Sequence, residues 1–266
     1  MNGILHGFDL LTYPLLPCDT TLIVSLLLIA FLWKEKRRST VCNVDCIRWG
    51  AHNLFEEEVK GKRVIEVGSY DVNGSLRYIV ELIKPTEYIG VDIIEGPGVD
   101  IICSVENLVR KFGKDRFDIV LSTCTLEHIR NWKKAISNIK NVCKPNGIIL
   151  IIVPSDWPFH VYPYDFWRYS KEDIKSIFSD CDIMVLDEDF HTPSLVYGKI
   201  RKPYDFTEID LSAYQLYSVI LNKRIREIQE ADFENPYFRR LVLKNRIKNI
   251  VLRIGRKIER LIDLKI

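Results

Sequence analysis

Residues 63–77 read Arg-Val-Ile-Glu-Val-Gly-Ser-Tyr-Asp-Val-Asn-Gly-Ser-Leu-Arg, and this stretch decides the fold. Val64–Val67 is a short, apolar, β-branched run, as is typical of one buried strand. Gly68 and Gly74 then interrupt the pattern, and helical spacing resumes at Leu76. A strand, a glycine turn and a helix N-terminus together place backbone N–H groups where a ligand can approach closely.

The turn after this first strand carries an acidic residue and lacks a phosphate-binding pattern. Glu66 places a carboxylate beside the turn. The spacing Gly-x-Gly-x-x-Gly, which seats the pyrophosphate of a dinucleotide, does not occur here. The sequence therefore favours a ligand with a positive centre and no phosphate.

From Val64 onward, short apolar runs alternate with segments of helical length. The expected strands are 64–67, 88–92, 99–103, 117–122, 148–153, 181–187 and 195–200, and the expected helices are 75–83, 105–112, 132–143 and 170–178. This alternation predicts right-handed βαβ crossovers and an α/β fold, with a doubly wound, mostly parallel sheet covered by helices on both faces.

The segment Glu66–Ser75, Glu-x-Gly-Ser-x-x-x-Asn-Gly-Ser, resembles the first motif of a subgroup of the class I S-adenosylmethionine-dependent methyltransferases. Further motifs of that family follow in order: Tyr88–Asp92, Gly96–Asp100, Phe117–Thr123, Leu126–Ile129, Lys144–Gly147 and the apolar run Ile148–Val153. The resemblance covers residues 45–200. It implies a seven-stranded sheet with an antiparallel last strand, and S-adenosyl-L-methionine as cofactor.

The resemblance also implies where the cofactor binds, beyond the carboxyl ends of the first strands. Asp92 is expected to accept hydrogen bonds from the ribose hydroxyls, with a turn cap as the alternative. Relatives carry an aspartate for the adenine amine where this chain has Ser104, so Ser104, Glu106 and backbone groups remain open candidates. The expected cofactor-binding residues are Glu66, Gly68, Ser69, Asn73, Gly74, Asp92, Ile93, Ser104 and Ser122.

Residues 157–169 form the most unusual segment, with seven aromatic residues in thirteen. Similar proteins carry a His-x-x-Pro-x-Asp-x-x-Arg loop here, matched by His160, Pro163, Asp165 and Arg168. An aromatic wall of this kind excludes water and can contact a sulfonium ion. The expected proton acceptors are His160, Asp165 and His128, and the expected substrate contacts are Tyr162, Tyr164, Trp167 and Arg168. A packed lid without chemistry is the alternative.

The charge distribution and the cysteines limit the kinds of partner, compartment and metal that the sequence favours. The 266 residues carry a net charge of +2, divided into +7 over residues 221–266 and −5 over the rest. An acidic body argues against a nucleic-acid groove. The seven cysteines show no repeated spacing, which favours a reduced, cytoplasmic protein without a disulfide framework. Cys42, Cys46 and His52 are candidate metal ligands. A protein without a metal at these residues is favoured, so the sequence predicts no metal.

Both ends of the chain carry apolar segments. Thr20–Trp33 is uncharged, and its fourteen residues would span about 21 Å as a helix, less than a bilayer core. A basic cluster follows it, which would keep the catalytic domain on the cytoplasmic side if the segment entered a membrane. A basic amphipathic helix is expected near the C-terminus, packed on protein or lying on lipid. The expected division is 1–40, 41–202 and 203–266.

These features predict methyl transfer to an oxygen or nitrogen of a small molecule, or of a glycan or lipid-linked acceptor. Two other classes remain open. A nicotinamide-dependent oxidoreductase can use the same sheet, although its phosphate loop is missing here. A non-catalytic or membrane-associated binding protein would retain the fold without turnover.

Overall fold

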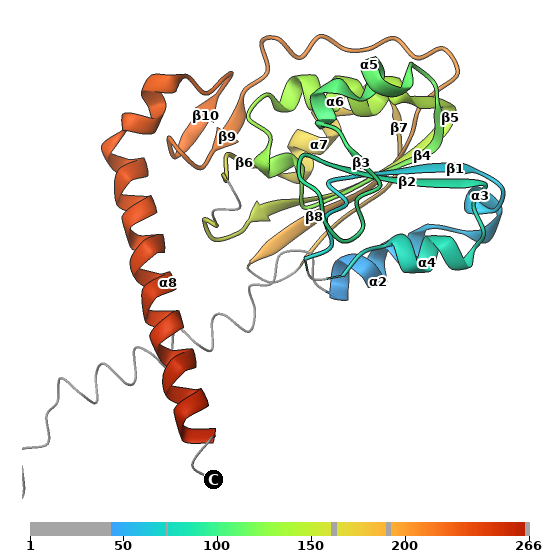
Figure 1. Cartoon of the computed structure of the whole chain (residues 1–266). Coiled ribbons are helices and arrows are strands. Elements are labelled where there is room, and N and C mark those ends of the chain that lie inside the picture. The colour runs from blue at the N-terminus through green and yellow to red at the C-terminus, as the bar shows by residue number, and fades with distance from the viewer. Residues whose placement is uncertain (1–43, 73, 161–163, 190–192, 264–266) are drawn as a thin grey trace, which may run out of the picture. The chain divides into compact units, whose positions relative to one another are not determined.

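The computed structural model describes residues 44–72, 74–160, 164–189 and 193–263, with side chains from residue 45 to residue 255 (Figure 1). The described residues from 44 to 247 form one compact unit. The last helix is α8 (Pro236–Asp263), and its residues from 248 onward belong to a second unit. The apolar segment Thr20–Trp33 lies outside the described residues.

Seven strands form the main sheet, in the order β3-β2-β1-β4-β5-β8-β7 (Figure 1). The strands β1, β2, β3, β4 and β5 are mutually parallel, whereas β8 runs antiparallel to both of its neighbours. This confirms the expected doubly wound fold with an antiparallel last strand. The strands are β1 (Arg63–Val67), β2 (Glu87–Asp92), β3 (Ile101–Ile102), β4 (Phe117–Thr123), β5 (Cys143–Asp156), β7 (Asp182–Glu188) and β8 (Ser194–Arg201).

Helices cover both faces of this sheet, and each face has its own apolar core (Figure 1). Leu108, Ile136 and Ile174 belong to the core of one face, and Cys46 and Val80 belong to that of the other. Burial on both faces explains why the strands read as continuous apolar runs rather than alternating ones. The first face carries α5 (Leu108–Phe112), α6 (Trp132–Val142) and α7 (Lys171–Ile177); the second carries α2 (Val44–Asn53), α3 (Glu56–Val59) and α4 (Arg77–Leu82).

The N-terminus of α7 shows how local sequence sets an element boundary. The Ser170 hydroxyl accepts a hydrogen bond from the backbone N–H of Asp173, and the Asp173 carboxylate accepts one from the backbone N–H of Ser170. Such a capping box satisfies two donors that the first helical turn leaves free. The helix expected over 170–178 therefore begins at this cap.

A second, three-stranded sheet, in the order β10-β9-β6, was not expected from the sequence. Its strands are β6 (Trp167–Arg168), β9 (Leu216–Ser218) and β10 (Lys223–Ile225). The aromatic segment thus pairs, through β6, with residues about fifty positions further along the chain. This sheet places the region after residue 203 at the rim of the main sheet that is formed by the carboxyl ends of its parallel strands.

The predicted C-terminal helix is present as α8, which is longer than expected and begins at Pro236. Among the residues described, no helix combines the length and apolar content needed to cross a membrane. The division into 1–40, 41–202 and 203–266 and the membrane contact of Thr20–Trp33 stay predictions.

Candidate functional site

The carboxyl ends of β1, β2 and β4 meet at one edge of the main sheet. The chain runs outward from β1 to β2 and β3, then crosses back to β4 on the other side of β1, so the strand order reverses beside β1. In open α/β sheets, ligands bind at this reversal. Gly68 and Ser69 both donate backbone N–H hydrogen bonds to the carbonyl of Val91, at 2.9 and 3.1 Å, which fastens the turn after β1 to the end of β2.

Gly68 occupies a backbone conformation with φ of +76°, as expected for a glycine turn. A Cβ at this position would lie 1.9 Å from the Thr125 Oγ1 atom. The absence of a side chain at Gly68 therefore makes room for Thr125, which lies in the connection after β4. Close approach of a cofactor to Gly68 stays a prediction.

Glu66 is buried, with 2% of its surface exposed. Its carboxylate accepts hydrogen bonds from the Tyr88 hydroxyl at 2.7 Å and from the Ser75 hydroxyl at 3.0 and 3.2 Å. Burial raises the pKa of Glu66 to about 7, against the lowering effect of these two donors. The carboxylate faces Ser75 and Tyr88 here, and the cofactor contact expected for Glu66 stays a prediction.

Asp92 ends β2 and organises the turn that follows. One carboxylate oxygen accepts backbone N–H bonds from Ile93 and Ile94, at 2.7 and 3.3 Å, and the other accepts one from Tyr70 at 3.3 Å. A carboxylate has about four acceptor sites, so one remains for a ligand hydroxyl. The turn-cap role is thus present, and it leaves room for the predicted ribose contact. Ile93 is 53% exposed at the same edge.

Two serine hydroxyls at this edge have no partner among the described residues. Ser69 and Ser122 are buried, at 2% and 1% exposure, and each Oγ atom lacks a hydrogen bond. Ser122 pairs with Val67 across β1 and β4, so both serines stand at the ends of neighbouring strands. Unpaired buried hydroxyls point to a missing polar partner. These hydroxyls, with Asp92, fit the polar amino-acid and ribose parts of an S-adenosylmethionine molecule.

The remaining predicted cofactor residues have local structural roles. The Ser104 hydroxyl accepts the backbone N–H of Glu106 and caps the short helix η1 (Val105–Asn107). Gly74, with φ of +117°, donates its N–H to Asp71 at 2.7 Å. Asn73 lies outside the described residues. Ser104 would therefore have to contact adenine while its hydroxyl also caps η1.

Asp165 forms the centre of the aromatic segment. It is 1% exposed and receives a two-point hydrogen bond from Arg168, at 2.6 and 2.8 Å. The same carboxylate lies 3.1 Å from the Nδ1 atom of His160. Burial alone would raise the pKa of Asp165, but Arg168 and His160 hold it well below its usual range. A carboxylate with such a low pKa is a poor proton acceptor, so its predicted role becomes the positioning of His160.

His160 and His128, both predicted proton acceptors, lie together with ring centroids 5.0 Å apart. Burial alone would lower the pKa of His160, yet Asp165 and the neighbouring Glu127 raise it above its usual value. His128 lies in η2 (Leu126–His128), directly after β4. Of these two imidazoles, His160 is the one oriented by a carboxylate, as in a general base held by an acidic partner.

The four residues predicted to contact the substrate lie in different surroundings. Trp167 is fully buried and its indole N–H donates to the Ile129 carbonyl at 3.0 Å, so it packs in the core and cannot touch a ligand. Tyr164 is 54% exposed and stacks on Phe166 with centroids 5.6 Å apart. Arg168 lines a pocket, whereas Tyr162 lies outside the described residues. The prediction for Trp167 is wrong because β6 carries it inward.

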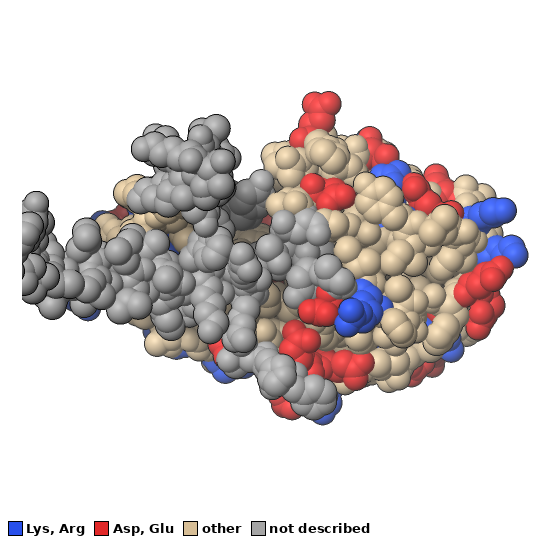
Figure 2. Space-filling view, turned by 90° about the horizontal axis from the view of Figure 1, so that it is seen from below, with Lys and Arg blue, Asp and Glu red and all other residues tan. Residues whose placement is uncertain are grey.

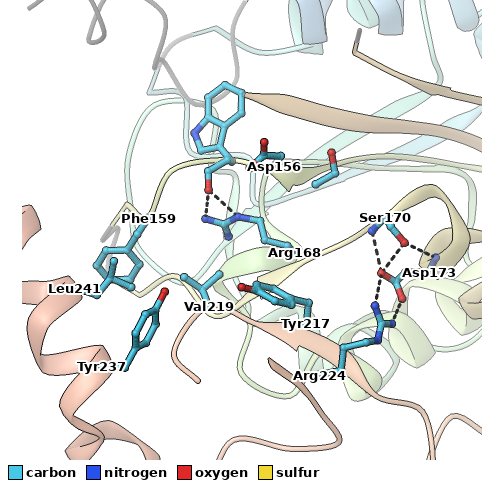
Figure 3. Close-up of a pocket in the computed structure, with 12 residues that line it drawn as sticks. Asp156, Phe159, Arg168, Ser170, Asp173, Tyr217, Val219, Arg224, Tyr237 and Leu241 are labelled. Atoms are coloured by element: carbon cyan, nitrogen blue, oxygen red, sulfur yellow. Dashed lines mark hydrogen bonds and ion pairs between the residues drawn. The ribbon is translucent and has the colours of Figure 1, made fainter. Parts of the chain in front are cut away.

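The pocket beside the end of β5 has a volume of about 440 Å³ (Figure 3). Arg168 reaches its wall and donates to the Trp157 carbonyl at 3.0 and 2.8 Å. The part of the lining that comes from β9, β10 and α8 was not predicted from the sequence. The lining residues are Ser155, Asp156, Trp157, Phe159, Arg168, Ser170, Asp173, Tyr217, Val219, Arg224, Tyr237 and Leu241.

Arg224 and Asp173 form the far wall of this pocket (Figure 3). Arg224 forms an ion pair with the buried carboxylate of Asp173, which also accepts a hydrogen bond from the Tyr214 hydroxyl at 2.8 Å. Arg168 and Arg224 are balanced in the lining by Asp156 and Asp173, while Tyr217 and Tyr237 contribute aromatic rings. The arrangement suits a compact molecule with an apolar ring and polar substituents.

Comparison with known proteins identifies one family model. Residues 36–182, more than half of the chain, match the model described as a methyltransferase domain. No curated protein sequence matches the chain.

Solved structures similar to this chain include a 1,6-didemethyltoxoflavin-N1-methyltransferase of Burkholderia thailandensis with bound S-adenosylhomocysteine. It is 14% identical over 73% of this chain and 93% of its own, with a TM-score of 0.48. A putative S-adenosylmethionine-dependent methyltransferase of Listeria monocytogenes is 14% identical, covering 59% and 97%, with a TM-score of 0.44. An S-adenosylmethionine-dependent methyltransferase of Mesorhizobium loti is 16% identical, covering 59% and 98%, with a TM-score of 0.43.

Proposed function

Because this chain belongs to the methyltransferase-domain family, we propose that it transfers a methyl group from S-adenosyl-L-methionine to an oxygen or nitrogen atom of a small acceptor. One observation carries the donor site. Asp92 and the unpaired hydroxyls of Ser69 and Ser122 lie at the carboxyl ends of three neighbouring strands, where the strand order reverses.

The donor site uses these groups in different roles. Asp92 accepts a hydrogen bond from one ribose hydroxyl at the acceptor site that its three backbone N–H bonds leave. Ser69 and Ser122 bind polar atoms of the methionine part. Ile93, half exposed beside Asp92, covers one face of the adenine. The methyl donor needs no phosphate site, which agrees with the missing glycine-rich phosphate loop.

The acceptor binds in the pocket beside β5. Its volume of about 440 Å³ suits a small molecule or one sugar-sized unit, and its charged side chains, Arg168 and Arg224 with Asp156 and Asp173, favour an acceptor with hydroxyl groups. A nucleic-acid acceptor is disfavoured, because Lys and Arg are interspersed with Asp and Glu on the face shown in Figure 2.

Methyl transfer proceeds by in-line displacement. The acceptor lone pair forms a bond to the methyl carbon, the electrons of the carbon–sulfur bond return to sulfur, and S-adenosylhomocysteine leaves. The acceptor then loses one proton. His160, whose Nδ1 atom is held by Asp165 at 3.1 Å, is the proposed recipient of that proton. Alignment of the two reactants supplies most of the rate, because the sulfonium is already a good leaving group.

The cytoplasm is the proposed location. A membrane-linked acceptor, such as a glycan or lipid intermediate, is proposed only in combination with the apolar segment Thr20–Trp33, which precedes a basic cluster. Extraction of the full-length protein with carbonate or detergent decides this point. Release into plain high-salt buffer would rule out insertion.

Calorimetric titration with S-adenosylhomocysteine tests the donor site. We expect a dissociation constant of about 1 µM for the wild type and a loss of at least about tenfold for Asp92→Ala. The matched control is Glu95→Gln, which alters an exposed acid in the same turn and should bind as the wild type does. Equal affinity in wild type and Asp92→Ala would remove Asp92 from the site, and no binding in the wild type would refute the proposed donor.

A further inference from the structure

Glu127 is a buried acid whose carboxylate has no hydrogen-bond partner among the residues that the structure describes. It is 1% exposed, and the lack of a partner applies to both carboxylate oxygens. Burying a carboxylate in this way is costly unless an ion or hydrogen-bond donor compensates it. The nearest basic atom is the Nε2 atom of His128, 3.8 Å from Oε1, which is too far for a hydrogen bond.

The hydrogen bonds of the two neighbouring histidines define their tautomers. The Nδ1 atom of His128 contacts the Tyr164 carbonyl, and the Nδ1 atom of His160 lies 3.1 Å from both the Pro158 carbonyl and the Asp165 carboxylate. Carbonyl and carboxylate oxygens only accept hydrogen bonds, so both Nδ1 atoms carry the proton. In the neutral rings, each Nε2 atom therefore presents a lone pair.

Three lone-pair donors thus converge. Ligand atoms of Glu127, His128 and His160 all lie within 4.8 Å of one another. The Nε2 atom of His160 is buried and, like the carboxylate of Glu127, has no partner in the described part of the chain. Three acceptors that face one another need a shared proton or a cation between them, and two imidazoles with one carboxylate form a set that divalent transition metals prefer.

The supporting structure holds these groups in place. The backbone N–H of Phe166 donates to the Glu127 carbonyl at 2.8 Å, and the Tyr169 hydroxyl donates to the Leu126 carbonyl at 3.2 Å. These bonds fasten η2 to the segment that carries His160. Asp165, in turn fixed by Arg168, orients the His160 ring. Histidine ligands of metals commonly donate their second N–H to a carboxylate or carbonyl, as both histidines do here.

We propose that Glu127, His128 and His160 bind one divalent transition-metal ion of the zinc type, with Asp165 and the Tyr164 carbonyl orienting the two imidazoles. The proposal goes beyond methyl transfer and revises the expectation of no metal. A bound ion occupies the Nε2 lone pair of His160, so His160 can take the acceptor's proton only when the metal site is empty. Bonds of about 2.0–2.1 Å to the ion require the side chains to close in slightly on the centre of the cluster. Magnesium and calcium are disfavoured, because they prefer ligand sets made of oxygen.

The test uses full-length protein without a histidine tag, stripped with a chelator and titrated with Zn²⁺ by calorimetry. We expect one Zn²⁺ per chain with a dissociation constant of about 1 µM or lower. Glu127→Gln and His160→Gln should each weaken binding at least about 100-fold, and Asp165→Asn about 10- to 100-fold. His52→Gln, which alters an exposed histidine on α2, is the matched control and should bind Zn²⁺ as the wild type does.

Two further measurements make the outcome decisive. Substituting Co²⁺ reports the ligands by absorbance: weak visible bands support the proposal, whereas a strong near-ultraviolet thiolate band assigns the ion to cysteine and overturns it. Circular dichroism and S-adenosylhomocysteine titration of each variant report whether it folds. Absence of stoichiometric Zn²⁺ in the wild type, or unchanged affinity in folded Glu127→Gln and His160→Gln, overturns the proposal. Zn²⁺ binding without S-adenosylhomocysteine binding refutes the proposed function alone, and the reverse result refutes the metal site alone.

Discussion

The Oγ1 atom of Thr125 lies 1.9 Å from the point where a Cβ atom on Gly68 would stand. Thr125 is held there by hydrogen bonds from its hydroxyl to the carbonyls of Val67 and Thr123, at 3.3 and 3.2 Å. The turn after β1 and the connection after β4 are therefore fitted to each other. Any side chain at residue 68 must displace Thr125 and also adopt a positive φ.

Gly68→Ala should destabilise the protein by at least about 3 kcal/mol, because strain at positive φ adds to a steric overlap. The matched control is Gly113→Ala. Gly113 has a φ of +84° but no atom within 4 Å of its would-be Cβ, so only about 1–2 kcal/mol of strain is expected. Urea unfolding measures both. Adding Thr125→Ala should bring the cost of Gly68→Ala close to that of Gly113→Ala; equal costs in the two single variants would contradict the overlap.

Glu66→Gln should change how stability depends on pH. Burial raises the pKa of Glu66 from 4.5 to about 7, so the folded state holds the proton more tightly than the unfolded state. The resulting stabilisation is fully present below pH 4.5 and is lost as pH rises through about 7, a change of about 3 kcal/mol.

Urea unfolding at pH 5 and pH 8 measures this effect. Wild type should lose about 3 kcal/mol more than Glu66→Gln between the two pH values, because glutamine keeps the shape of the side chain but cannot ionise. Glu95→Gln, an exposed acid, should follow the wild type. An identical pH dependence in wild type and Glu66→Gln would show that Glu66 titrates normally.

Asp173→Asn should lower the free energy of unfolding by about 2 kcal/mol. The carboxylate caps α7 and also binds Arg224 and Tyr214, so the substitution weakens the link between α7 and the second sheet. Glu172→Gln changes the exposed acid beside it and should cost little. Thermal or urea unfolding decides between them, and equal stability of the two variants would exclude a structural role for this link.

Glu58→Gln should cost about 3 kcal/mol, because it leaves a buried ammonium group without its counter-ion. Lys199, in β8, is 1% exposed, and its Nζ atom lies 2.8 Å from each oxygen of Glu58. The neighbouring exposed Glu57 provides the control as Glu57→Gln. Chemical unfolding that finds Glu58→Gln as stable as Glu57→Gln would mean that Lys199 is solvated or neutral.

The main sheet could be predicted from the sequence because each strand is a compact apolar run separated from the next by a helix or a glycine turn. Val64–Val67 and Ile148–Val153, for example, lie inside β1 and β5. The second sheet could not be predicted, since β6 has two residues and β9 and β10 have three each. Strands this short carry no periodicity, and they form only because the tertiary fold brings them together.

Part of the candidate site could also be predicted from the sequence. Asp92 and Ser122 follow recognisable strands, so their position at the open edge is a consequence of topology. Glu127, in contrast, reads as an ordinary solvated acid at the start of a helix, and its burial depends on contacts with residues 164–169. The only sequence signal was its place beside His128. Trp167 was misassigned because composition alone does not tell which face of a segment turns inward.

The length of β5 has a further consequence. Its pairing with β4 ends at Ile152, yet it continues to Asp156 beside β8, and Ser155, Asp156 and Trp157 form one wall of the pocket. The pairing of β5 with β8 shifts register between Pro154 and Asp156, and consecutive residues line the pocket at this irregular end. A substitution in this projecting end would alter the wall locally, whereas inserting or deleting a single residue there would change the register and re-aim the side chains of the wall. This end of the strand should therefore tolerate exchange of side chains but not a change in its length.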